Sequence, residues 1–315
     1  MSSTLTLPAE SANAVDRDDS AAAAAVPRAG GLRPVLAPLA VVGACVAIYW
    51  PTLAALPAVW ELDPNYSHGY AIPFASLLFA WRAWRRHGLP VAARVDWSDA
   101  PAGVVRMLLG FAVHAGCLFA ELPFFDVLSL VLVLTGALGV LGGRAAQRAY
   151  GFPVFFLIFM APLPLPIYNW LALNLQEFAS AAGAFLLQAG GVPVFREGCH
   201  IQIPGYAMEV GAACSGLRQL TAIVALSLAT GHLSGRRWAY KWALGLSSIP
   251  IAVAANCIRV TLTGYIMLWF GRKWAEDMYH TLEGLAMVGV AAVLLLMTAG
   301  FLAWLLPEKG SKVEG

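Results

Sequence analysis

Charged side chains are scarce in this sequence of 315 residues. Asp, Glu, Lys and Arg together make up 12% of it, whereas hydrophobic residues make up 59% and the mean hydropathy is +0.69. Because an ordinary soluble domain carries roughly a quarter charged residues, a soluble core could not bury this much apolar surface. The low charge therefore excludes a typical soluble protein and predicts an integral membrane protein.

A surplus of charge of one sign is also missing. The formal net charge is +2, with 20 Lys and Arg against 18 Asp and Glu, and the basic residues lie in short clusters between apolar runs. This distribution is typical of topological charges in a membrane protein rather than of a surface that binds nucleic acid. We therefore expect membrane lipid, and no nucleic acid, as a partner.

Cysteine is too sparse and too scattered to form a framework. The thiols are odd in number and include no Cys-x-x-Cys pair, so neither a disulfide scaffold nor a metal site is indicated. We expect no metal and no cofactor, and whether Cys199 pairs with another thiol stays open. The five cysteines are Cys45, Cys117, Cys199, Cys214 and Cys257.

Bulky apolar side chains are rare in residues 1–33, which are rich in Ser, Ala and Asp. Such a composition is typical of disorder, and acidic residues lie where a signal peptide would carry basic ones. We expect residues 1–33 to form a disordered cytoplasmic tail, residues 34–306 a polytopic membrane domain, and residues 307–315 a second cytoplasmic tail.

Apolar runs long enough to cross a bilayer recur along the rest of the chain. A hydrocarbon core of roughly 30 Å needs about 20 helical residues at a rise of about 1.5 Å each. On this criterion the sequence predicts an all-α integral membrane protein with about eight transmembrane helices. The predicted spans are 35–56, 69–85, 102–120, 126–142, 150–165, 214–232, 239–258 and 282–305.

The basic clusters orient these spans, because short loops that carry Lys and Arg are retained in the cytoplasm. All clusters fall on one side if both termini are cytoplasmic, which predicts a multi-pass protein of the cytoplasmic (inner) membrane. The outer segments, which face the periplasm or the exterior, are then 57–68, 121–125, 166–213 and 259–281. The clusters are Arg28 and Arg33; Arg82, Arg85, Arg86 and Arg94; Arg144 and Arg148; Arg236, Arg237 and Lys241; and Lys309 and Lys312.

The long outer segment 166–213 is more than a loop. Its first part has apolar residues near helical spacing that are interrupted by Asn, Gln and Glu, which predicts an amphipathic helix at the outer interface. Two short spans or one full crossing remain alternatives, and a single added crossing would invert everything after it. Alternating polarity around the Pro204-Gly205 turn signal predicts a short β-hairpin on the outer face.

Reactive and ionisable groups lie at the predicted outer edge of the membrane, where such groups favour a functional hypothesis. Cys214 begins the sixth predicted span, so the helix N-terminus favours its thiolate, and Arg218 follows one turn later on the same face. The residues around them, including Ser215, are small and leave room for an extended backbone. An inert packing residue is the alternative for a cysteine in an apolar helix.

Two further groups reach the same predicted depth. Arg259 ends the seventh predicted span, about 27 Å along the helix from Lys241, although an arginine that snorkels to head groups would have the same position. His280 precedes the last span, where a solvated interfacial histidine is the alternative. Cys257 points to a different face from Arg259, so we interpret it as a packing residue.

Cys214, Arg259 and His280 form a chemically coherent set, because three separate helices each deliver one of them to a single plane. A thiolate attacks a carbonyl carbon, a histidine transfers a proton to the leaving amine, and an arginine stabilises the oxyanion or holds a substrate carboxylate. The set predicts a cysteine peptidase or transpeptidase, with water or another nucleophile as the acceptor.

Five ordered motifs resemble the exosortase/archaeosortase family and together cover about residues 40–305. The motifs are DPNYSHG at 63–69, APLPLP at 161–166, AACSGLR at 212–218, NCIRV at 256–260, and His280. The resemblance implies a catalytic domain at residues 34–306 that cleaves C-terminal sorting signals of secreted proteins. It further implies Cys214 as nucleophile, Arg259 as the catalytic arginine and His280 as the acid and base.

The resemblance also implies substrates that carry a short motif, one transmembrane helix and a basic C-terminal tail. Arg218, Asn256 and His68 carry over as family positions whose roles are less settled. At the first motif, a Ser67 that caps a helix before an interfacial His68 is the alternative.

Two other functions stay open. In a transporter or polysaccharide-export component, the arginines and His280 would line a pathway and Cys214 would be incidental, but the middle of each predicted span is almost free of charge. A non-catalytic assembly scaffold would not need the thiol at all.

Overall fold

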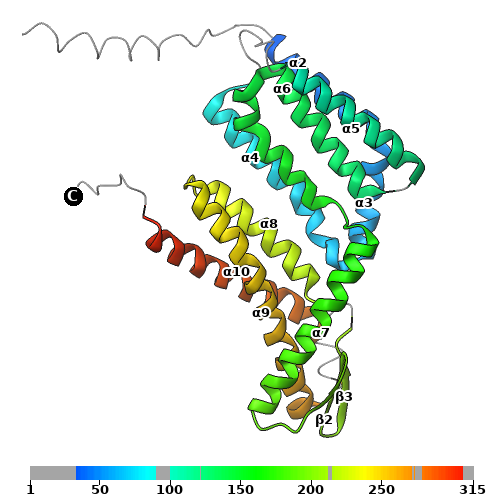
Figure 1. Cartoon of the computed structure of the whole chain (residues 1–315), viewed down its shortest axis with the longest axis vertical. Coiled ribbons are helices and arrows are strands. Elements are labelled where there is room, and N and C mark those ends of the chain that lie inside the picture. The colour runs from blue at the N-terminus through cyan, green and yellow to red at the C-terminus, as the bar shows by residue number, and fades with distance from the viewer. Residues whose placement is uncertain are drawn as a thin grey trace, which may run out of the picture.

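The computed structural model describes residues 33–89, 100–120, 122–211, 215–271, 273 and 279–307, with the backbone alone for residues 33–35 and 279–285. Within these ranges the chain is almost entirely helical, with one small sheet, and long helices run side by side in two groups (Figure 1). The first group contains the helices up to α6, and the second contains α7 to α10.

The first predicted span, 35–56, is broken. α2 (Arg33–Ile48) and α3 (Trp50–Leu62) meet at Tyr49 with a bend of 67°. Pro51 in the first turn of α3 has no N–H to give to a preceding helix but fits the start of a new one. The predicted span 35–56 therefore corresponds to two helices joined at a bend, which together are long and apolar enough for one span.

A short 3-10 helix, η1 (Pro64–Tyr70), leads into α4 (Ala71–His87). The predicted span 69–85 corresponds to α4, and the predicted span 102–120 corresponds to α5 (Ala100–Ala120). Gly88, with φ 75°, ends α4 by donating its N–H to the carbonyl of Trp84.

α6 (Pro123–Phe156) folds back on itself at Gly143, whose φ of 61° and ψ of −153° are not helical. Gln147 Nε2 donates to the carbonyl of Thr135 at 3.3 Å, although twelve residues of straight helix would separate them by about 18 Å. The two arms of α6 therefore correspond to the predicted spans 126–142 and 150–165. The second arm ends in η2 (Leu157–Met160).

The predicted helix in the outer segment is present as α7 (Leu165–Ala189), and three of its four interrupting polar residues, Asn169, Asn174 and Glu177, are exposed as expected. Large apolar side chains such as Trp170 and Phe178 are exposed, whereas Gln176 is buried. A Cβ at Gly183 would lie 2.6 Å from Val260 Cγ1, so small residues allow the neighbouring helix to approach closely. The exposed surface of α7 therefore carries apolar and polar side chains together.

The predicted hairpin at Pro204-Gly205 is confirmed, and it gains a third strand. β2 and β3 pair as Ile203↔Tyr206 across a turn in which Gly205 has φ 81°. β1 adds to β2 in the antiparallel order β1-β2-β3. The strands are β1 (Phe195–Glu197), β2 (His200–Ile203) and β3 (Tyr206–Glu209).

The last three helices are α8 (Leu217–Leu233), α9 (Trp238–Phe270) and α10 (Tyr279–Leu305). α9 runs twelve residues beyond the predicted end at 258, so the predicted outer segment 259–281 is helical as far as Phe270. The cause is the apolar run after Arg259, which continues until Gly271 ends the helix with φ 85°.

Four described helices are long and apolar enough to cross a membrane, and the bent α2–α3 pair adds a fifth if it is one span. The expected number of eight is not confirmed, since α4 and α8 have only 17 residues each. Many large apolar side chains are exposed on these helices, as a multi-pass membrane protein requires. By length and composition alone the four are Ala100–Ala120, Pro123–Met160, Trp238–Phe270 and Ala286–Leu305, of which Pro123–Met160 takes both arms of α6 together with η2.

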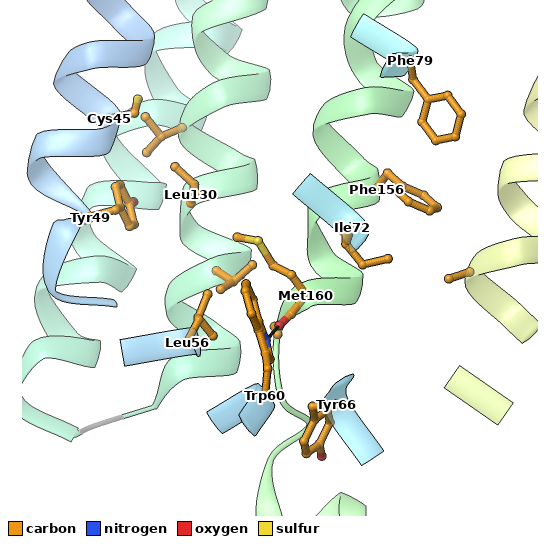
Figure 2. Packing of buried hydrophobic residues seen from close by; sticks show 14 residues of the cluster. Cys45, Tyr49, Leu56, Trp60, Tyr66, Ile72, Phe79, Leu130, Phe156 and Met160 are labelled. Carbon is orange, nitrogen blue, oxygen red and sulfur yellow. Dashed lines mark hydrogen bonds between the residues drawn. The ribbon is translucent and has the colours of Figure 1, made fainter. Parts of the chain in front are cut away.

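Buried aromatic and aliphatic side chains join the helices of the first group (Figure 2). Trp60 contributes most directly, since its Nε1 donates to the carbonyl of Met160 at 2.9 Å. A Cβ at Gly69 would lie 2.4 Å from the same indole. Trp60 therefore fixes the end of α3 against both η1 and η2.

Candidate active site

The three predicted catalytic residues are described to different extents. Cys214 lies outside the described residues, and for His280 the structure gives only the backbone, in the first turn of α10. Arg259 is described in full: it lies inside α9 and its side chain is buried, with 8% exposure. A snorkelling arginine at a helix end, the alternative for this residue, does not fit its place within a longer helix.

The helix that was expected to begin at Cys214 begins three residues later, at Leu217. Gly216 has φ 77°, a left-handed conformation that glycine adopts without strain. Ser215 is fully buried, and its Oγ accepts a hydrogen bond from the N–H of Leu217 at 3.3 Å. The expectation that Arg218 follows Cys214 by one helical turn was therefore wrong, because Gly216 interrupts the helix between them.

Gly216 also brings α8 against α9. A Cβ at Gly216 would lie 2.5 Å from Asn256 Cγ, so only glycine leaves room for the Asn256 side chain. Asn256 is 3% exposed and precedes Arg259 by three residues, so both lie on one face of α9. The segment that follows Cys214 thus packs against the helix face that carries Arg259.

His68 approaches the same region from η1. It is half-buried, and this burial lowers the pKa of its imidazole below the ordinary value of 6.5; the charge of Arg218 lowers the pKa further, while the carbonyls of Phe159 and Asn65 oppose the shift. His68 is therefore neutral at pH 7. Because the charge of Arg218 reaches His68, the motif at 63–69 lies near the motif at 212–218.

Ser67 does not cap a helix, contrary to the alternative weighed for it. Asp63 caps η1 instead, since its carboxylate accepts the N–H of Asn65 at 2.9 Å, and Ser67 lies inside η1. Asn65 Nδ2 donates to both Asp63 Oδ1 and Tyr168 Oη, at 2.9 and 2.8 Å. These bonds tie η1 to the start of α7.

The motifs at 63–69 and 161–166 are also in direct contact. The N–H of Leu163 donates to Tyr66 Oη at 3.2 Å, and Tyr66 is itself buried. Four of the five motifs are therefore connected in a chain of contacts that runs from residues 161–166 to η1, then to the start of α8, and then to Asn256 on α9. The fifth, His280, lies on α10, which packs against both α8 and α9.

Sequence reasoning missed a second polar cluster, between α5 and α6. His114 Nδ1 and Asp126 Oδ1 are 2.5 Å apart, and both side chains are buried. Thr52 and Ser129 also donate to the Asp126 carboxylate. The signal was available, because a histidine and an aspartate inside apolar runs stand out in a membrane protein. Asp126 also lines a cavity of about 440 Å³ beside the broken helix pair.

A family model described as transmembrane exosortase (Exosortase_EpsH) matches residues 60–297, about three quarters of the chain. The chain belongs to the transmembrane exosortase family. The matched range of this exosortase includes all five motifs and begins at Trp60, the residue that fixes α3 to η1 and η2. No curated protein and no solved structure matches the chain.

Proposed function

We propose that this exosortase is a cysteine peptidase or transpeptidase that cleaves C-terminal sorting signals of secreted proteins at the outer face of the cytoplasmic membrane. Cys214 is the nucleophile, Arg259 the oxyanion or carboxylate partner, and His280 the acid and base. The contact between Gly216 and Asn256 is the main support, because it joins the segment next to Cys214 to the face of Arg259.

The reaction divides into two balanced steps. The Cys214 thiolate bonds to the carbonyl carbon of the scissile peptide, and the C–N bond breaks as protonated His280 gives its proton to the leaving amine. Water or an acceptor nucleophile then attacks the carbonyl carbon of the resulting thioester and gives its proton to His280, while the C–S bond breaks and restores the Cys214 thiolate. The guanidinium of Arg259 faces the oxyanion in both steps, in a buried setting where its field is weakly screened.

The surroundings of this site suit a substrate with a transmembrane helix. Apolar side chains such as Trp170, Phe178 and Trp269 are exposed on α7 and α9, so a substrate helix can pack beside them in the lipid. The substrate's cut site would then reach Cys214, and its basic tail would stay in the cytoplasm.

The decisive experiment co-expresses the exosortase with a substrate that carries the three-part C-terminal signal. Cys214→Ala and Cys214→Ser should each abolish processing while the protein still accumulates in the membrane. Cys199→Ser is the matched control, because Cys199 is a free, half-buried thiol on the sheet. Undiminished processing by both Cys214 variants would reject the catalytic proposal.

Removal of the other two groups tests their roles separately. Arg259→Ala should reduce processing by about 100- to 1,000-fold, the cost of losing an oxyanion partner, and His280→Ala should have a comparable effect. Arg196→Ala, which removes an exposed arginine of β1, should leave processing unchanged. Mild effects of both site variants would indicate a different site.

The orientation has its own test. A membrane-impermeant thiol reagent added from outside should label Cys199 or Cys214 but not the buried Cys45. Labelling of Cys199 only from the cytoplasmic side would show that the proposed topology is inverted.

A transporter is the second candidate, favoured by the buried His114–Asp126 pair next to a cavity and a broken helix, which are features of transport sites. In that case Asp126→Asn would abolish function while Cys214→Ala would be silent. If Cys214 is the nucleophile, Cys214→Ala should abolish the chemical step and Asp126→Asn should reduce it less. Both variants are compared on protein that remains folded.

A further inference from the structure

Cationic side chains from three helices converge on one cavity at the end of the bundle remote from η1. The cavity has a volume of about 180 Å³, room for about six waters at their share of the liquid volume. Arg82 and Arg86 come from the end of α4, Arg148 from the second arm of α6, and Lys241 from the start of α9. We call this group the basic cavity.

His232, at the end of α8, forms the aromatic wall of the basic cavity. Its ring stacks on Phe152 with centroids 3.8 Å apart and planes inclined by 3°. The positive charges of Lys241, Arg86 and Arg82 lie close enough to interact electrostatically with this imidazole. The imidazole therefore has a fixed orientation beside the cations, and none of the described residues that line the cavity is acidic.

The cations of the basic cavity have no carboxylate partner in the part of the chain that the structure describes, where His114–Asp126 is the one ion pair. Like charges that share a cavity repel one another, so an anion that enters it gains from all of them at once. Membrane topology explains why arginines and lysines gather at this end. It does not require that they converge on a common cavity, and Arg85, on the same helix, lies over Trp81 at 5.0 Å instead.

We propose that the basic cavity binds a phosphate group, presented by an anionic phospholipid at the membrane surface or by a free phosphate ion. Arginine and lysine from different helices can surround the phosphate oxygens with charge-assisted hydrogen bonds. The cavity lies about 24 Å along α8 from Gly216, sixteen residues away, which is close to the thickness of the hydrocarbon core. The site therefore lies at the level of the head groups of the opposite leaflet, and it is independent of Cys214.

The experiment uses the full-length protein in nanodiscs of phosphatidylcholine, with and without phosphatidylglycerol, and counts the lipid that the protein retains by native mass spectrometry. Wild-type protein should retain phosphatidylglycerol selectively. Arg82→Gln/Arg148→Gln should weaken this retention about 25-fold, at about fivefold for each cation. The control Arg85→Gln/Arg237→Gln changes net charge equally outside the basic cavity and should have no comparable effect.

A second arm titrates inorganic phosphate into phosphatidylcholine nanodiscs and follows the thermal unfolding of the protein. Saturable stabilisation that the cavity variant loses and the control keeps identifies free phosphate as the source, whereas selective lipid retention alone identifies the phospholipid. If the double variant does not accumulate, Lys241→Gln replaces it. Equal losses in cavity and control variants, or no loss in either arm, would overturn the proposal.

Discussion

The two ends of the helical bundle are built on opposite principles. At the η1 end, which comprises η1, η2 and the start of α8, buried and half-buried polar groups form hydrogen bonds between elements, as with Trp60 and the carbonyl of Met160. At the basic end, cations such as Arg82 are exposed and converge without a carboxylate in the described residues. The η1 end can hold catalytic side chains in fixed positions, whereas the basic end can bind an anion.

The largest loss of stability is expected for Asp126, on the η1 side of the bundle. Asp126→Ala leaves His114 without its partner and should cost about 3–5 kcal/mol of unfolding free energy, measured by thermal unfolding in detergent. Asp126→Ala/His114→Leu should recover part of this loss, because it also removes the imidazole that the single variant leaves without its carboxylate partner. A single variant as stable as the exposed control Glu197→Ala would contradict the importance of the pair.

Gly216→Ala should cause the second-largest loss of stability. It forces a left-handed conformation that costs about 1–2 kcal/mol, and its Cβ meets Asn256, which adds about 1–3 kcal/mol of overpacking. Gly205→Ala is the matched control, since Gly205 has φ 81° but nothing lies within 4 Å of the added atom. The Gly216 variant should also lose processing. Equal effects of the two variants on stability and processing would show that the close contact between Gly216 and Asn256 is not important.

His68 predicts a smaller, pH-dependent effect. Because burial lowers its pKa in the folded state, the unfolded state binds a proton more readily as the pH falls below about 6.5. Its contribution to stability is therefore present above that pH and is lost as the pH falls through the folded-state pKa. The Tm of wild-type protein should drop more than that of His68→Gln between pH 7.5 and 5, and parallel curves would show that folding does not lower the pKa of His68.

The smallest effect is expected at the basic end. Arg82→Gln should change the unfolding free energy by no more than about 0.5 kcal/mol in the absence of anions, because exposed charges contribute little to stability. A loss as large as that of Gly216→Ala, measured in the same detergent, would show that the basic end is structural and would erase the contrast between the two ends.

Much of the helical framework followed from apolar runs and from basic clusters. The limits of α5 and the hairpin at Pro204-Gly205 were predictable, because length and turn chemistry are local properties. The two arms of α6 on either side of Gly143 correspond to the predicted spans 126–142 and 150–165, because the length of each apolar run is also a local property. The break at Tyr49 was not predicted, although Pro51 is a local signal for it, because the hydrophobicity is uninterrupted across the bend.

The contacts around the site were not predictable from the sequence. Counting residues from Lys241 placed Arg259 at the outer edge of the membrane, and the structure buries its side chain inside α9, whereas a depth shared with Cys214 stays a prediction. The start of α8 was misplaced because the conformation of Gly216 depends on the approach of α9, which is a tertiary contact. The meeting of His68 with Arg218 likewise joins elements about 150 residues apart, a separation that no periodicity reports.

The meeting of Cys214 and His280 can be measured directly by cross-linking. Cys45, Cys117, Cys199 and Cys257 would be replaced by Ala, His280→Cys introduced, and a short bifunctional thiol reagent added to membranes. The control Ala303→Cys lies about 35 Å along α10 from residue 280.

If residues 214 and 280 lie close together, mass spectrometry should detect an intramolecular cross-link between them and none between residues 214 and 303. If both thiols react singly with a monofunctional reagent but residue 280 never cross-links to Cys214, the two groups do not share a pocket, and the proposed active site is wrong.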